Sequence, residues 1–170
     1  MPILTQTYSA NTAIALDLSS LATSTSLLGG RESAQIDNSA TQYLDAIVNV
    51  GGILGHASSA PVVGQFIGIY VWGSNVSLAG APIDALDGTE SVENLTHGGV
   101  LNSLKLAASP TVTAANANQL YHAQPFGVAQ FFGGVLPKFW GLFVSHNHTG
   151  NLAAANNSLF SFNGITYTST

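Results

Sequence analysis

The residues best suited to chemistry in this sequence are two histidines in its last quarter, His146 and His148. Two positions apart on a strand, they would point to the same side of a sheet, where paired imidazoles could bind a metal ion. A third ligand would have to come from a histidine far away in the sequence, namely His56, His97 or His122. We favour the simpler interpretation, in which two polar residues enter a turn at residues 147–151, and we expect no metal site.

Four of the eight acidic residues fall in one short segment, at Asp84, Asp87, Glu90 and Glu93. Their spacing lacks the alternation of a dedicated calcium loop. Nothing in the sequence places two of them across a cleft, as a glycosidase requires. We therefore expect residues 84–99 to form a long solvated loop.

The usual signatures of catalysis are missing from the chain. There is no G-x-S-x-G elbow, no Walker-type phosphate loop and no dinucleotide-binding glycine spacing. The absence of cysteine excludes disulfides and thiolate metal sites. A Ser–His–Asp triad assembled from distant residues is left open, but we predict neither an enzyme nor a cofactor.

Charge is unusually scarce, because only 6% of the 170 residues are Asp, Glu, Lys or Arg, against roughly 25% in an ordinary soluble domain. Three basic residues and a net charge of −5 argue against nucleic-acid binding and against an anionic membrane surface. A free monomer normally keeps a charged surface to stay soluble. The composition therefore indicates a surface covered by copies of the same chain or by a partner.

Several segments have the alternation or the apolar density of β-strands. Ile14, Leu16 and Leu18 would face one side of a half-buried strand. Residues 62–72 are rich in Val, Ile, Phe, Tyr and Trp, which is typical of a central strand buried on both faces. Further strands are predicted at residues 42–50, 100–107 and 139–146. Without a convincing βαβ unit, this pattern predicts an all-β antiparallel sandwich of seven or eight strands in a single domain.

A hairpin is predicted near the end of the chain. Asn163-Gly164 separates two strand-like runs, at residues 159–162 and 165–168. Both central positions of a type I′ turn need a positive φ, which Asn-Gly supplies. We therefore expect the chain to reverse direction there.

Residues 1–9 have few core positions and little turn signal. We expect either an arm that reaches a neighbouring subunit or a frayed terminus, and we assign the sandwich to residues 10–170. The first four residues lack the positive charge of a signal peptide. No apolar run approaches the ~20 residues of a transmembrane helix.

Phe139 and Trp140 are adjacent on a predicted strand and so face opposite sides. We expect one ring in the core and the other at a subunit contact, where aromatic residues are enriched. The alternative is a sugar-binding platform, for which the candidates are Trp72, Tyr121 and Trp140.

Two segments carry a more specific pattern. Residues 31–50 read RESAQIDNSATQYLDAIVNV, and residues 132–150 read FGGVLPKFWGLFVSHNHTG. Together they resemble a family of small bacteriophage virion proteins found beside the major capsid protein. The match covers about a quarter of the chain, and the sequence departs from the family in the histidines around Asn147 and in the long segment 84–99.

The resemblance implies a jelly-roll-like β-sandwich that forms a homotrimer on the outer capsid surface of the virion, as a cement or decoration protein. Its partners would be further copies of itself and the phage major capsid protein, assembled in the cytoplasm of the host bacterium. The alternatives are a tail or fibre component and a carbohydrate-binding adhesin built on the same sandwich.

Two groups of residues are candidates for contacts in such an assembly. Arg31 is the only guanidinium in the chain and can bind a carboxylate through two hydrogen bonds. With Glu32 and Asp37 it would anchor the N-terminal segment to a neighbour or to the sandwich, the alternative being an ordinary surface ion pair. The second group, expected as a contact or a strand brace, comprises Pro137, Lys138, Phe139 and Trp140.

Overall fold

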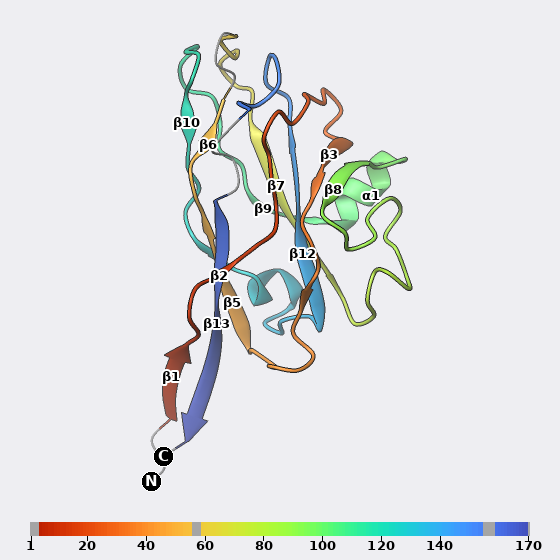
Figure 1. Cartoon of the computed structure of the whole chain (residues 1–170), viewed down its shortest axis with the longest axis vertical. Coiled ribbons are helices and arrows are strands. Elements are labelled where there is room, and N and C mark those ends of the chain that lie inside the picture. Colours follow the sequence, from red (N-terminus) through yellow and green to blue (C-terminus); the bar gives the residue numbers. More distant parts are fainter. Residues whose placement is uncertain (1–3, 56–58, 155–158, 170) are drawn as a thin grey trace.

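The computed structural model describes residues 4–55, 59–154 and 159–169, and nearly all regular structure in these residues is β-strand (Figure 1). All the strand pairs in these ranges are antiparallel. Two sheets pack against each other with a hydrophobic core between them. The prediction of an all-β antiparallel sandwich is confirmed.

The first sheet has the order β1-β13-β5-β11, with β2 also paired to β13. Its strands are β1 (Leu4–Tyr8), β2 (Thr12–Ala13), β5 (Asp45–Val50), β11 (Phe126–Gly127) and β13 (Phe160–Ser169). The second sheet has the order β8-β3-β12-β7-β9, with β4 also paired to β12. Its strands are β3 (Gly29–Glu32), β4 (Ile36–Asp37), β7 (Ile67–Ser74), β8 (Ser91–Asn94), β9 (Lys105–Ala108) and β12 (Phe139–His146).

A third, two-stranded sheet pairs β6 (Ile53–Leu54) with β10 (Leu120–Tyr121). The described residues also include a short helix, α1 (Gly98–Ser103), and a 3₁₀ turn, η1 (Ala129–Phe132). No helix in this part of the chain is long and apolar enough to cross a bilayer.

Successive strands pass between the two main sheets in the pattern of a jelly roll. β2 lies in the first sheet, β3 in the second and β5 in the first, and β7 and β9 are neighbours in the second. β11, β12 and β13 then fall in the first, second and first sheets. The orders β2-β13-β5-β11 and β3-β12-β7-β9 are those of a double-sheet jelly roll with two Greek keys. The jelly-roll-like sandwich is therefore confirmed, and β8 extends its second sheet.

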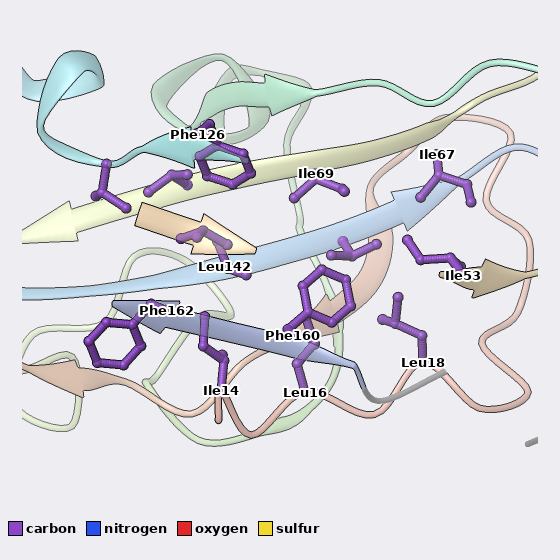
Figure 2. Packing of buried hydrophobic residues seen from close by; sticks show 14 of the residues in the cluster. Ile14, Leu16, Leu18, Ile53, Ile67, Ile69, Phe126, Leu142, Phe160 and Phe162 are labelled. Carbon is purple, nitrogen blue, oxygen red and sulfur yellow. The ribbon is translucent and has the colours of Figure 1, made fainter. Parts of the chain in front are cut away.

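Alternate residues of β12 supply the centre of the core between the sheets. Trp140, Leu142 and Val144 are buried there, together with Phe160 and Phe162 of β13 (Figure 2). The rings of Trp140 and Phe162 meet edge to face, with their centroids 5.3 Å apart. Ile14, Leu16 and Leu18 are buried in the same core, as their predicted common side requires, but the strand predicted there is wrong, because β2 ends at Ala13 and residues 14–18 belong to no strand.

The second sheet is covered on its outer face as well. Phe139 and Phe143 of β12 join Tyr70 and Trp72 of β7 in a second cluster, which we call the outer cluster. The segment 78–104 covers it with Leu78, Leu86, Leu95 and Leu104. Because both faces are covered, every residue of β12 is buried, as is every residue of β7 from Ile67 to Trp72. The expected central strand at residues 62–72 is thus observed from Ile67 onward.

The predicted hairpin at Asn163-Gly164 is wrong, because β13 runs without interruption through both residues. Gly164 pairs with Ala46 of β5, and a β-carbon at this position would lie 2.4 Å from the ring of Tyr43. The glycine therefore serves the close approach of an aromatic ring to a strand rather than a turn.

The predictions for residues 84–107 are wrong in part. Residues 91–94 form β8 on the edge of the second sheet, and residues 98–103 form α1, so that β9 begins only at Lys105. An edge strand tolerates polar and charged residues because one side of it is not paired. This composition made β8 resemble a loop.

The start of the described chain forms half of a two-stranded ribbon. β1 pairs with the last part of β13, from Leu4 opposite Ser169 to Tyr8 opposite Ile165. All five residues of β1 are exposed, and the two strands project beyond the body of the sandwich (Figure 1). We call residues 4–8 and 165–169 the ribbon.

We expect Gly164→Ala to destabilise the fold by about 1–3 kcal/mol, the usual cost of forcing an extra group into a packed site. Gly98→Ala is the matched control, because a β-carbon there meets no atom within 4 Å. Urea unfolding of both variants measures the difference. Equal midpoints for the two variants would show that Tyr43 moves aside without cost.

Candidate functional site

Arg31, on β3, binds within its own chain. Its Nε donates to Oε1 of Glu90, and its Nη2 donates to Oε2 at 3.0 Å. Oε1 also accepts the N–H of Asp17 at 3.1 Å. The hydrogen bond from Arg31 is the main reason why the pKa of Glu90 is lowered. Of the two contacts expected for Arg31, with a neighbour or with the sandwich, this geometry matches the second, and it ties the segment 78–104 to β3.

Glu32, beside Arg31 on β3, has a fully buried carboxylate. Its two oxygens accept the backbone N–H groups of Asp87 and Gly88, each at 3.0 Å. Burial disfavours the charged form and raises the pKa of Glu32 to about 7. Glu32 therefore holds the segment that covers the outer cluster through hydrogen bonds, and its buried side chain cannot contact a neighbouring subunit.

The other candidate contact residues divide between surface and interior. Asp37 and Lys138 are exposed, whereas Pro137, Phe139 and Trp140 are buried. The expectation that one of the two rings faces a subunit contact is wrong. Phe139 lies in the outer cluster and Trp140 lies between the sheets, so both are covered by the chain itself.

The aromatic residues proposed for a sugar platform are also inaccessible. Trp72, Tyr121 and Trp140 are exposed by 1%, 3% and 1%. Stacking on a sugar needs an open ring face, so these three residues cannot form such a platform. Of the tyrosines, Tyr8 and Tyr167 of the ribbon are the exposed ones in the described ranges.

The acidic segment does not gather its carboxylates into one site. Glu90 binds Arg31, whereas Asp84 accepts the N–H of Thr96 at 2.6 Å and its hydroxyl at 2.8 Å. Across the described ranges there is no group of three or more His, Asp or Glu residues able to hold a metal ion. Of the three distant histidines considered as metal ligands, His97 and His122 are exposed and His56 lies outside the described residues.

Three adjoining grooves lie where the ribbon joins the sandwich. The largest, of about 570 Å³, is lined in part by Leu44, Val135 and Tyr167, which are exposed by 54%, 69% and 46%. A groove of about 510 Å³ shares Leu44 with it, and one of about 310 Å³ shares Val135. We call the residues around these grooves the base surface: Tyr43, Leu44, Asn75, Val135, Leu136 and Tyr167.

The ribbon beside the base surface has two open edges in the described structure. β5 follows β13 only as far as Ile165, so that beyond this residue β13 pairs with β1 alone. Neither half of the ribbon contains a charged residue or a proline. Natural proteins usually protect exposed strand edges with such residues, and an isolated two-stranded ribbon is only marginally stable in water. The ribbon therefore has the properties of a strand pair that is completed by another chain.

A separate polar cluster lies at the other end of β12. His146 and His148 are buried, with ring centroids 5.4 Å apart, and the ring of Tyr121 lies 4.8 Å from that of His148. Nε2 of His146 lies 2.9 Å from the carbonyl oxygen of Leu21. Burial lowers the pKa of both histidines, to about 4 for His148. Both rings are therefore neutral at pH 7. The chain bends at residues 149–150 after them, but no hydrogen-bonded turn forms at residues 147–151, and the two histidines lie inside the protein.

Sequence reasoning missed the base surface and the role of Glu32. A usable signal for the first was Gly133-Gly134, since both residues have positive φ and so place Val135 at an exposed turn. The sequence carried no comparable signal for Glu32, because its partners are backbone N–H groups more than fifty residues away.

We expect the buried carboxyl of Glu32 to make stability fall as the pH rises. Between pH 4.5 and 7 the folded state holds a proton that the unfolded state has lost, so the contribution of this group is largest below pH 4.5 and disappears above pH 7. Unfolding free energies of wild type and Glu32→Gln at pH 5 and pH 8 measure it.

The lowered pKa values of the buried histidines make stability rise with pH, opposite to the effect of Glu32. The quantity to compare is therefore the difference in unfolding free energy between wild type and Glu32→Gln at each pH. The wild type should lose on the order of 2 kcal/mol relative to the variant over this interval. Parallel pH profiles would contradict this role of Glu32.

None of the protein-family models, curated proteins or solved structures compared with this chain matches it. The ribbon and the base surface are the features of the structure that bear most directly on its function.

Proposed function

We propose that this chain is a structural protein of a bacteriophage virion, a capsid cement protein that forms a homotrimer on the outer capsid surface. In this role it bridges neighbouring copies of the major capsid protein and so reinforces the shell. The observation that carries the proposal is the uncharged ribbon with two open edges, which projects beside the exposed apolar base surface.

The scarcity of surface charge supports association. The single arginine and the buried Glu32 are both engaged inside the chain. The ribbon and base surface together carry a group of exposed apolar side chains, namely Leu4, Tyr8, Leu44, Val135 and Tyr167. Apolar residues grouped in this way mark surfaces that another protein covers.

The fold is one that proteins in this role share with proteins of other functions. Double-sheet jelly rolls occur in viral capsid proteins, in lectins and in cupins, and function depends on the surface rather than on the fold. The sequence resemblance to small phage virion proteins is what favours a capsid over the other settings.

A cement protein needs no catalytic group, because its work is done by buried area and by bridging. A specific interface buries roughly 1,600 Å² in total. When one trimer contacts several capsid subunits, the separate weak contacts add up through their high effective concentration. The ribbon would supply strand pairing, and the base surface would supply the apolar area.

One observation favours a second function, a carbohydrate-binding adhesin. The largest groove is lined by Tyr43 and Tyr167 together with the polar side chains of Asp45 and Gln130. Aromatic rings beside a carboxylate and an amide can bind a sugar. Binding on a glycan array that Tyr167→Ala abolishes would favour this function.

We expect light scattering of the purified chain to give about 52 kDa, three times 17.5 kDa. Tyr167→Lys places a charge on the ribbon and should give a monomer of 17.5 kDa with an unchanged fold. Val62→Lys is the matched control, since Val62 is exposed in the turn before β7 and should leave the trimer intact.

The same three proteins are then mixed with capsids that lack the cement protein. Wild type and Val62→Lys should sediment with the shells, and Tyr167→Lys should do so weakly. A wild-type monomer that does not bind the shells would overturn the proposal.

A further inference from the structure

The polar cluster at the end of β12 contains more unsatisfied polar atoms than the rest of the described structure together. Five buried side-chain nitrogen or oxygen atoms in these residues have no hydrogen-bond partner. Three of them belong to Tyr121, His146 and His148 of this cluster, and a fourth belongs to Gln119, which precedes β10. Buried polar atoms in native proteins are almost always paired, and each exception needs an explanation, such as a bound ion or water.

The row of side chains on the interior face of β12 continues with two histidines at and just beyond the end of the strand. Trp140, Leu142 and Val144 face the core between the sheets, and His146 and His148 follow at the same two-residue spacing. His146 is fully buried, and His148 is exposed by only 3%. The two rings therefore lie inside the protein at the margin of an otherwise apolar core.

The hydrogen bond of His146 determines which of its nitrogens can bind a ligand. Nε2 lies 2.9 Å from the carbonyl oxygen of Leu21, and a carbonyl can only accept, so Nε2 carries the hydrogen. Nδ1 then has a free lone pair, and it is one of the unpartnered atoms. An imidazole that donates one N–H to a carbonyl and offers its other nitrogen is the usual arrangement of a histidine bound to a metal.

The positions of the neighbouring rings fit a shared metal ion. With metal–nitrogen bonds of about 2.0–2.1 Å and a tetrahedral angle, the centroids of two bound imidazoles lie about 5 Å apart. The observed separation between His146 and His148 is 5.4 Å. The ring of Tyr121 has its centroid 4.8 Å from that of His148, and its unpartnered hydroxyl is the candidate for a third donor.

We infer that His146 Nδ1, His148 Nε2 and the Tyr121 hydroxyl form a binding site for a divalent transition metal such as Zn²⁺. Two imidazole nitrogens exclude Ca²⁺ and Mg²⁺, which take oxygen ligands, and suit Zn²⁺, Cu²⁺ or Ni²⁺. The proposal does not depend on the oligomer or on the capsid.

The metal would have a structural role. β10 is only two residues long and pairs with β6 outside both main sheets. A metal bound by Tyr121 of β10 and by the two histidines at the end of β12 would tie this small sheet to the sandwich. Since a site of this kind exists only in the folded state, metal binding would stabilise the fold.

The test uses the full-length chain after dialysis against a chelator, with Zn²⁺ and Co²⁺ as the probes. Co²⁺ should produce the visible absorption of a four-coordinate ion, and Zn²⁺ should abolish it by displacement. At a Zn²⁺ concentration about a hundred times Kd, the Tm should rise by roughly 5–10 °C.

Three variants locate the site. His148→Gln removes a ligand and should abolish both the Co²⁺ spectrum and the Tm shift. Tyr121→Phe keeps the ring and removes only the oxygen, so it should fold, bind Zn²⁺ at least tenfold more weakly and change the Co²⁺ spectrum. His122→Gln is the control, because His122 is exposed beside Tyr121 and should leave every measurement unchanged.

Two results would overturn the proposal. One is a wild-type chain with no Co²⁺ absorption and no Tm shift, which would assign the unpartnered atoms to a buried water. The other is a wild-type signal that Tyr121→Phe leaves unaltered and His122→Gln abolishes, which would place metal binding on the surface. If His148→Gln does not fold, the comparison of Tyr121→Phe with His122→Gln still decides between these outcomes.

Discussion

The structure depends on the burial of β7 and β12 on both of their faces. A jelly roll needs only one apolar face per sheet, yet these two strands carry large apolar side chains on both sides. The inner face packs against the first sheet, and the outer face needs a cover of its own. The segment 78–104 supplies that cover and is the main elaboration of this fold.

The cover accounts for how the few charges are used. Arg31 binds Glu90, and Glu32 accepts two N–H groups from Asp87 and Gly88, so both residues at the end of β3 hold the covering segment. On the first sheet, Asp45 accepts the N–H of Ala129 at 2.7 Å and fixes the η1 turn. Charges that hold loops in place are not available to keep the surface soluble. The exposed residues of the ribbon are uncharged, and Lys138 is the exposed charged residue that lines one of the grooves of the base surface.

The sequence was sufficient to predict the fold class, the central strand that is observed from Ile67 onward and the strand at residues 139–146, because their apolar runs are dense. The burial of Ile14, Leu16 and Leu18 was predicted from a different signal, the alternation of apolar residues at every second position. The predicted hairpin at Asn163-Gly164 was wrong because the glycine makes room for the ring of Tyr43, a residue far away in the sequence. Arg31 was identified by its chemistry, whereas burial of Phe139 depended on a covering segment that resembled a loop. Local patterns report periodicity, but they do not report what distant segments lie over a strand.

The central place of β13 in the first sheet has a consequence for how the chain folds. β13 lies between β1 and β5, and Leu4 meets its partner only at Ser169. During synthesis, β1 and the edge of β5 that faces β13 must therefore stay unpaired until β13 is made, although β11 can pair with the other edge of β5 earlier. Such non-local pairing slows folding and exposes intermediates to aggregation. We infer that the first sheet is completed only after translation of β13.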